Sequence, residues 1–354
     1  MNPVGRVGVI QDACFFDHQV QRQSKECPDR LRKLYLDIEQ DPSFKRLIRI
    51  PVRAASETQI CRVHSEHYLK QILAHAINPD PYSYDTDTYL VTESPHVAKL
   101  SSGSCLALAD ALMDGEIDTG FAMVRPPGHH AEIGRGTGFC IFNNIAITAQ
   151  HLIDRHGLNR IMILDFDVHH GNGTQDVFYQ TDKVLTLSIH QNNLFPFTGK
   201  STETGEGEGC GYNINIPVPP QFGDAEYSCL FGTIVQNVIE HYLPQIILVS
   251  AGYDAHMDDP ISQTNISTDG FYSMTRALKH FAKNVDAQLL FILEGGYNLA
   301  SLSDSARASL RALGEPLSIP GFLHAPRAIQ NIKNEWPSEL IQKWIPDAIE
   351  SYIC

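Results

Sequence analysis

The sequence lacks a long apolar run. None of its 354 residues lies in a stretch approaching the ~20 apolar residues that a helix needs to cross a bilayer, which argues against a membrane-spanning protein. The start of the chain also carries no apolar segment long enough for a secretory signal. We therefore expect a cytoplasmic protein, with export by a signal-less route as the alternative.

Clustered cysteines and basic residues are also scarce. Eight cysteines are scattered along the chain without a CxxC pair, which indicates reduced thiols instead of a disulfide framework. Only 27 Lys and Arg oppose 41 Asp and Glu, and the net charge of −14 disfavours binding to nucleic-acid phosphates. A hydrophobic fraction of 43% is ordinary for a folded chain and excludes general disorder. The sequence does not indicate an oligomeric state.

Short apolar runs alternate with segments of helical spacing. The runs are continuous, as in strands buried on both faces of a parallel sheet, and cover residues 7–10, 47–52, 121–124, 161–165, 184–189, 246–250 and 289–293. The helical segments cover residues 58–76, 97–113, 141–155, 225–242, 268–283 and 299–313. We predict a single α/β domain over residues 1–354, with an open parallel sheet covered by helices on both faces. Its core covers about residues 5–320, and a C-terminal tail (321–354) packs on the body or on a partner.

Acidic and imidazole side chains follow the expected strand at residues 161–165. Side chains alternate along a strand, so Asp165, Asp167 and His169 point to one side if the extended conformation persists. Two carboxylates and an imidazole buried there without partners would cost of order 2–7 kcal/mol or more, and a bound cation removes that cost. The alternative is a hydrogen-bonded turn.

A further carboxylate, Asp254, follows the expected strand at residues 246–250. Asp167, His169 and Asp254 make a set of one nitrogen and two oxygen ligands. Three protein ligands with one open position are typical of a catalytic zinc ion. The same ligands accept iron(II), and a helix N-cap is the alternative role for Asp254.

Two adjacent histidines, His129 and His130, follow the run at residues 121–124 and a pair of prolines. Imidazole titrates near neutral pH, so two imidazoles held by a stiff turn are a candidate acid/base pair. Asp165 and Asn172 can each accept the second N–H of an imidazole. Two surface histidines are the alternative.

Aromatic side chains occur in three loops at expected strand ends. In the tripeptide Gly295-Gly296-Tyr297, the glycines expose a phenol, which is a neutral donor suited to an oxyanion. Phe139, which follows Gly138, and Phe195 can wall a narrow apolar channel. Ordinary core packing is the alternative for all three aromatic residues.

Together these residues resemble the zinc-dependent histone deacetylase family of the arginase/deacetylase superfamily. The resemblance covers roughly residues 5–320 and rests on ordered motifs. They are ECPDRL (26–31), VHSEHYL (63–69), RPPGHH (125–130), GFC followed by FNN (138–144), DFDVHHGNGTQ (165–175), SAGYDAH (250–256) and EGGY (294–297). The resemblance implies an open parallel sheet of eight strands with the arginase/deacetylase fold.

The resemblance also implies two kinds of metal site. It assigns one zinc ion to Asp167, His169 and Asp254. It implies a structural potassium ion near Asp165, His169 and Ser188, held mostly by backbone carbonyls.

The family's catalytic groups match residues of this chain. The resemblance implies a tandem dyad of His129 and His130, with Asp165 behind His129, and Tyr297 as the catalytic tyrosine. Asn172 stands where many members carry an aspartate behind the second histidine. This departure is similar to the class II and bacterial branches of the family.

The resemblance implies hydrolysis of acetyl or other acyl amides on lysine side chains of proteins or peptides. Phe139 and Phe195 match the acyl-lysine tunnel, and the glycines at positions 138, 295 and 296 line the same region. Asp87 falls at the rim where an acidic residue can bind the substrate backbone.

Three alternative functions are considered. Acetylpolyamine or other small N-acetyl amine hydrolysis is mildly disfavoured, because Ile261 stands where an acidic gate is expected. An arginase-like two-manganese hydrolase is disfavoured because the dyad occupies one of the positions that a second metal needs. A deacetylase-like binding module without activity should have lost a ligand or the tyrosine, and all are present.

Overall fold

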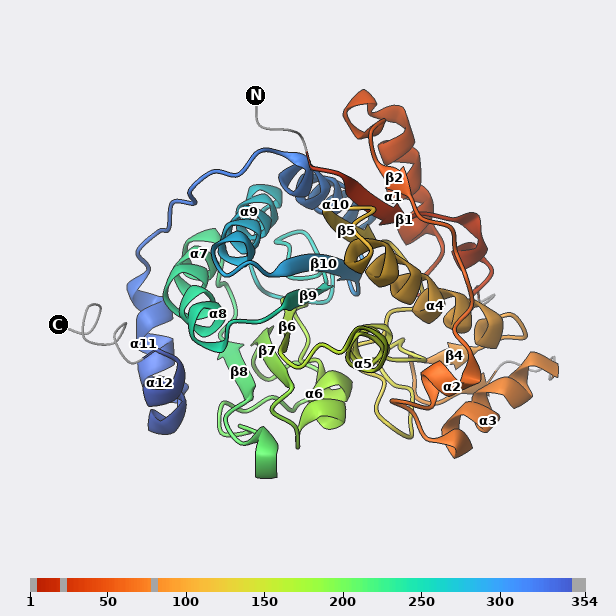
Figure 1. Ribbon diagram of the computed structural model, residues 1–354, viewed down its shortest axis with the longest axis horizontal. Helices are drawn as coiled ribbons and strands as arrows, with labels where there is room; N and C mark the ends of the chain where they lie inside the picture. Colours follow the sequence, from red (N-terminus) through yellow and green to blue (C-terminus); the bar gives the residue numbers. More distant parts are fainter. Residues whose placement is uncertain (1–4, 20–23, 78–81, 346–354) are drawn as a thin grey trace.

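Eight parallel strands form one open sheet in the order β2-β1-β5-β10-β9-β6-β7-β8 (Figure 1). The structure is a computed structural model that describes residues 5–19, 24–77 and 82–345. The strands are β1 (Val7–Ile10), β2 (Ile48–Arg49), β5 (Thr119–Ala122), β6 (Ile161–Asp165), β7 (Val184–Gln191), β8 (Asn213–Val218), β9 (Ile246–Ala251) and β10 (Gln288–Leu293). The predicted α/β fold with an eight-stranded parallel sheet is confirmed. A separate antiparallel pair consists of β3 (Tyr82–Ser83) and β4 (Tyr89–Leu90).

Helices cover both faces of this sheet. They are α1 (Asp29–Gln40), α2 (Glu57–Ile60), α3 (Glu66–Ala74), α4 (Ser94–Met113), α5 (Asn144–His156), α6 (Asn172–Phe178), α7 (Asp224–Leu230), α8 (Gln236–Tyr242), α9 (Thr268–Asn284), α10 (Leu299–Gly314), α11 (Pro326–Glu335) and α12 (Ser338–Trp344). The pair α4 and α5 packs on one face, and the pair α9 and α10 packs on the other (Figure 1). Every residue of the central strands β6 and β9 is therefore buried, as their continuous apolar runs predict.

The prediction was less accurate at the sheet edges. The run at residues 47–52 pairs only over Ile48–Arg49, and the sequence pattern does not predict β8. β8 reads NINIPV, and Pro217 is tolerated because the strand lies at the edge. Its two asparagines are buried because both side-chain amides donate to the side-chain oxygen of Gln175, at 2.9 Å from Asn213 and 2.8 Å from Asn215.

One predicted helix is interrupted, and another is continuous but contains a π-helical segment. The segment at residues 58–76 forms α2 and α3, because the Ser65 hydroxyl accepts the backbone N–H of Tyr68 at 3.2 Å and starts a new helix. The segment at residues 225–242 forms α7 and α8, with a π-helical segment (Phe231–Val235) between them.

The carboxyl ends of the central strands lie at one edge of the sheet. Asp165, the last residue of β6, is in register with Ser188 on β7 and with Ser250 on β9. Ser250 is in turn in register with Ile292 on β10. The loops that leave β5, β6, β9 and β10 therefore start side by side, where ligands collect in open α/β sheets.

The two C-terminal helices pack on the body of the protein. α11 lies against α7 and β8, and α12 lies against α8. The indole N–H of Trp336 donates to the carbonyl of Asn215 at 3.2 Å, and that of Trp344 donates to the carbonyl of Gly211 at 2.7 Å. The end of the predicted tail (346–354), with Cys354, lies outside the described residues.

No helix in the described parts of the chain is long and apolar enough to cross a membrane. The cysteines of these parts are all free thiols. The cytoplasmic location and the lack of nucleic-acid binding stay predictions.

A buried ion cluster connects the N-terminal segment to the loops at the carboxyl edge of the sheet. The Glu26 carboxylate accepts from Arg125 Nη2 at 2.7 Å and from Arg30 Nη1 at 3.2 Å, and all three side chains are fully buried. Arg125 also donates to the carbonyl of Phe15, and Arg30 donates to that of Gly296. Burial by itself raises the pKa of Glu26, but the guanidinium charges of Arg125 and Arg30 outweigh burial and lower that pKa to about 2.

We predict that Glu26→Gln lowers the free energy of unfolding by about 3–5 kcal/mol, because it leaves two buried guanidinium groups without a counter-charge. Because the Glu26 pKa is lower in the folded than in the unfolded chain, this stabilisation is present above the unfolded pKa and is lost as the pH falls toward 2. Urea unfolding at several pH values measures it.

The matched control is Glu39→Gln, since Glu39 pairs with Arg49 at 3.8 Å and both side chains are about 60% exposed. We expect this change to cost at most ~1 kcal/mol. Equal losses from the two substitutions, or a Glu26→Gln effect that persists unchanged at low pH, would show that the buried cluster does not stabilise the fold as described.

Candidate metal and catalytic site

The side chains of Asp167, His169 and Asp254 meet at the carboxyl edge of the sheet. His169 Nδ1 lies 3.0 Å from Asp167 Oδ1 and 3.1 Å from Asp254 Oδ2, and all three residues are buried. One potential ligand atom from each lies within 4.8 Å of the others. The structure thus brings together the three metal ligands that the sequence predicts from two strand ends.

The charges in this cluster fit a bound cation. Burial and the neighbouring charge of Asp167 raise the pKa of Asp254 to about 7. Burial acts on Asp167 in the same direction, but the imidazoles of His129 and His169 outweigh it and hold the Asp167 pKa below its usual range. Two ionised carboxylates buried this close repel each other, and a divalent cation removes that repulsion. One nitrogen and two oxygens are a donor set suited to zinc or a similar transition metal.

The backbone orients both carboxylates. The N–H of Val168 donates to Asp254 Oδ1 at 3.0 Å, and the N–H of Gly295 donates to Asp167 Oδ2 at 2.8 Å. A Cβ atom on Gly295 would lie 2.1 Å from Asp254 Oδ2. Only glycine therefore lets the loop after β10 come this close to the two carboxylates.

Two other groups of potential ligands occur in the described residues. The first combines Asp110, His151 and His156. Arg53 and Arg155 each lie 3.3 Å from the Asp110 carboxylate, so its charge is already balanced by guanidinium groups. The second combines His129, Cys140 and Glu294, and shares its histidine with the predicted dyad. Of these three groups, the one formed by Asp167, His169 and Asp254 has two buried carboxylates and no guanidinium group of the described residues to balance their charge.

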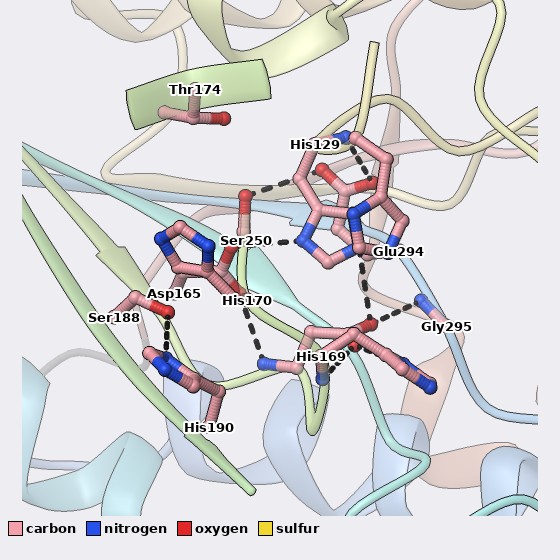
Figure 2. Close-up of polar contacts among 12 residues, drawn as sticks. His129, Asp165, His169, His170, Thr174, Ser188, His190, Ser250, Glu294 and Gly295 are labelled. Carbon is pink, nitrogen blue, oxygen red and sulfur yellow. Dashed lines mark hydrogen bonds and ion pairs between the residues drawn. The ribbon is translucent and has the colours of Figure 1, made fainter. Parts of the chain in front are cut away.

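The predicted dyad lies beside this cluster. The rings of His129 and His130 have centroids 4.0 Å apart. His129 Nδ1 lies 2.9 Å from Asp165 Oδ2 (Figure 2). His130 Nδ1 lies 2.8 Å from Asn172 Oδ1. Asp165 and Asn172 thus contact the two histidines in the predicted arrangement.

The partners of Asn172 define which nitrogen of His130 carries hydrogen. The Asn172 amide nitrogen donates to Glu132 Oε1 at 2.9 Å, so its oxygen faces His130 as an acceptor. His130 Nδ1 must therefore donate to that oxygen. In the neutral ring, Nε2 is left with a free lone pair that can accept a proton.

The two imidazoles have opposite electrostatic environments. Burial by itself lowers the pKa of His129, but the carboxylates of Asp167 and Asp165 outweigh it and raise that pKa to about 10. Burial and the positive charges of His129 and His169 lower the pKa of His130 well below its usual value. Such a separation is typical of paired groups with different acid/base roles.

Glu294 is a site residue that the sequence pattern does not assign. Its carboxylate accepts the backbone N–H of Gly128 at 2.7 Å and of His129 at 3.1 Å, and accepts from the Ser250 hydroxyl at 3.2 Å (Figure 2). It therefore fixes the backbone that carries the dyad. Glu294 is the first residue of the EGGY motif, but its hydrogen-bond partners lie far away in the sequence and can be identified only from the fold.

Aromatic rings flank the dyad. The ring of Phe195 packs edge-on against His130 with centroids 5.1 Å apart, and the ring of Phe139 lies 5.4 Å from that of Tyr297. A Cβ atom on Gly138 would lie 2.5 Å from His130 Cδ2 and 2.8 Å from Phe195 Cε1. Phe195 therefore packs against the dyad and Phe139 against Tyr297, and Gly138 lies close to His130 and Phe195.

Comparison with known proteins identifies the family. The family model for the histone deacetylase domain matches residues 24–313. The chain belongs to the histone deacetylase family. Its arginase/deacetylase fold is also that of the solved HDA15 HD domain, which aligns with a TM-score of 0.89, 31% identity and coverage of 99% of this chain and 98% of that one.

Curated relatives include plant and archaeal deacetylases. "Histone deacetylase 14, chloroplastic" of Arabidopsis thaliana is 43% identical over 64% of this chain and 55% of its own length. "Probable deacetylase" of Archaeoglobus fulgidus is 35% identical over 87% of this chain and 89% of its own length. The chain thus spans little more than half of the plant deacetylase but nearly all of the archaeal one.

Asp85 holds the loop that carries Gly138. Its Oδ2 atom accepts from the Thr137 hydroxyl at 2.8 Å and from the N–H of Gly138 at 3.2 Å. The side chain of Asp87, the predicted rim residue, is exposed, and its backbone N–H donates to Asp85 Oδ1 at 2.8 Å. Ile261 is half-buried on the loop that follows Asp254.

A small cavity lies beside Asp165, the residue that contacts His129. It measures about 10 Å³ and is lined by Asp165 and Ser188, among other residues. The Ser188 hydroxyl lies 2.9 Å from His190 Nδ1 (Figure 2). The cavity is about as large as one water-sized sphere.

We predict that Gly138→Ala lowers kcat/KM for an acetylated peptide by about 10²-fold, because the new methyl group displaces the His130 and Phe195 rings. The backbone φ of +56° at this position adds strain, and we expect a loss of about 1–3 kcal/mol in unfolding free energy. Steady-state kinetics and urea unfolding measure the two effects.

Gly134→Ala is the matched control, since a Cβ atom there meets nothing within 4 Å. Both quantities should stay near their wild-type values in this variant. If kcat/KM and the unfolding free energy of Gly138→Ala equal those of the control, Gly138 is not packed against the His130 and Phe195 rings as described.

Proposed function

We propose that this deacetylase is a zinc-dependent amidohydrolase that removes acetyl or other acyl groups from lysine side chains of proteins or peptides. Membership of the histone deacetylase family supports this proposal. The observation that carries it is the buried cluster of Asp167, His169 and Asp254 beside the histidine dyad. A cluster with this donor set and an adjacent base is suited to hydrolysis of an amide.

The proposed mechanism begins with the metal site. Zinc bound by Asp167, His169 and Asp254 would supply a Lewis acid for the acyl carbonyl and a lowered pKa for the attacking water. His130 Nε2 accepts the proton of that water as its oxygen attacks the acyl carbon. His130 then returns a proton to the leaving amine nitrogen as the carbon–nitrogen bond breaks.

The remaining groups stabilise charge. The Tyr297 hydroxyl donates a hydrogen bond to the oxyanion of the tetrahedral intermediate. His129, held by Asp165, places positive charge next to the reacting groups. Asn172 keeps His130 in the tautomer whose Nε2 atom can accept a proton.

The substrate channel follows from the aromatic contacts. Phe139 and Phe195 would hold the lysine stem, whose four methylenes gain at most ~0.8 kcal/mol each on burial. Gly138, with the glycines at positions 295 and 296, leaves room for the acyl group. Asp87 is proposed to bind the substrate backbone at the rim, and the apolar Ile261 favours a lysine peptide over a polycationic amine.

A potassium ion is proposed near Asp165, His169 and Ser188. The small cavity lined by Asp165 and Ser188 supports this assignment. A monovalent cation there would offset part of the negative charge of Asp165 and would keep its side chain directed at His129.

We predict that the purified enzyme contains close to one zinc ion per chain and that Asp254→Ala loses both the metal and the activity. Removal of one of three ligands breaks the site. Elemental analysis of the folded variant provides the measurement. Asp110→Ala, in the competing group of ligands, should retain the metal; the reverse pattern would contradict the ligand assignment.

We predict that Tyr297→Phe lowers kcat by ~10²–10³-fold, because it removes one hydrogen-bond donor to the oxyanion while leaving the metal ligands intact. Kinetics on an acetyl-lysine peptide and on acetylspermidine measure both the role of the tyrosine and the substrate class. We expect higher kcat/KM on the peptide. A preference for acetylspermidine would overturn the lysine assignment, and full activity of Tyr297→Phe would overturn the role of the phenol.

A further inference from the structure

The two residues before Tyr297 have few conformational limits of their own, because both are glycine. Gly295 and Gly296 precede it, and Gly296 has a φ of +117°, a conformation that residues with side chains rarely adopt. Glycine restricts the backbone less than any other residue. The direction of the phenol therefore depends on contacts from outside this loop.

The peptide group between Gly296 and Tyr297 is held at both ends. The carbonyl of Gly296 accepts from Arg30 Nε at 2.6 Å. The N–H of Tyr297 donates to Asp259 Oδ2 at 2.7 Å. The two hydrogen bonds act at opposite edges of one peptide group and fix its orientation. This orientation sets the direction in which the Tyr297 side chain leaves the backbone.

Asp259 is itself fixed in one orientation. Its Oδ2 atom also accepts the N–H of Asn298 at 3.2 Å, and its Oδ1 atom accepts the N–H of Ile261 at 3.1 Å. The Asp259 N–H donates to the carbonyl of His256 at 2.9 Å, and the residue is only 6% exposed. Both carboxylate oxygens are therefore in use, and the side chain cannot rotate without losing hydrogen bonds.

Asp259 connects two loops that carry different parts of the proposed site. It lies five positions after Asp254 on the loop that follows β9, and it contacts the loop that follows β10. The side chain of Asn298 reinforces the connection by donating to the carbonyl of Asp258 at 3.0 Å. The position of Tyr297 is thus tied to the loop that carries Asp254, a proposed metal ligand.

We propose that Asp259 is a positioning residue for catalysis, which holds the Gly296–Tyr297 peptide so that the Tyr297 hydroxyl stays directed at the oxyanion. This inference rests on the proposed catalytic role of Tyr297. Asp259 touches neither the substrate nor the metal in this scheme. It acts only through the tyrosine.

The first test is Asp259→Asn. The amide keeps one acceptor oxygen and replaces the other with a nitrogen donor, so at least one of the three N–H groups loses its partner. We expect kcat to fall by about 10- to 100-fold with KM within about 2-fold of wild type, since only the oxyanion donor is displaced. Zinc content and melting temperature should stay close to wild type. An unchanged kcat would overturn the proposal.

Asp258→Asn is the matched control. Asp258 is the preceding residue, its side chain is 66% exposed, and the same substitution should leave kcat, KM and zinc content unchanged. An equal loss in both variants would point to a general electrostatic effect of the loop and would contradict the positioning role.

A double-mutant cycle separates positioning from a structural role. In the Tyr297→Phe background no hydroxyl remains to be positioned, so adding Asp259→Asn should change kcat by less than about 2-fold. A full, multiplicative loss in that background would overturn the inference. Full activity of Tyr297→Phe alone would instead overturn the proposed role of the tyrosine, so the two failures are distinguishable.

A second variant and a direct readout cover the case in which Asp259→Asn is unstable. Asp259→Ser keeps an oxygen acceptor on a shorter side chain, and its kcat per zinc-loaded chain should fall in the same selective way. Fluorotyrosine at position 297 should give one sharp ¹⁹F resonance in the otherwise wild-type enzyme and broadened or multiple resonances with either substitution. A single unchanged resonance would show that Asp259 does not restrain the ring.

Discussion

The repulsion between two buried carboxylates is the constraint on which this structure depends. Asp167 and Asp254 lie at the ends of different strands, and both face the same imidazole nitrogen of His169. Such an arrangement is unfavourable unless a cation is bound, so the surrounding fold must hold it in place. Parallel strands in register provide the frame, and a backbone N–H on each carboxylate fixes the direction in which it points.

The loops around this cluster are fixed in a common way. Asp85, Glu294 and Asp259 each accept two or more backbone N–H groups, and they hold the loop at Gly138, the histidine dyad and the tyrosine loop, respectively. A carboxylate with several N–H donors is well satisfied when buried and defines the geometry of an irregular segment. The loops of the site are therefore held in place by hydrogen bonds to carboxylates, although they lie outside the helices and strands.

Much of this arrangement can be predicted from sequence, for physical reasons. The meeting of Asp167 and Asp254 is predictable because the carboxyl ends of parallel strands gather at one edge of a sheet. The partners of Glu26 are not, since Arg125 is 99 positions away and the contact depends on the fold. Strand β8 is missed because its buried asparagines do not look like core residues until Gln175 is placed beside them. The hydrogen bonds from Thr137 and Gly138 to Asp85 are not predictable either, because they depend on the backbone course of a short turn.

The central claim is that three side chains hold one metal ion beside the dyad. The most direct measurement is diffraction from crystals of the zinc-loaded protein at wavelengths above and below the zinc absorption edge. We expect one strong anomalous peak about 2 Å from Asp167, His169 and Asp254. A peak held instead by Asp110, His151 and His156, or no peak at the edge of the sheet, would contradict it.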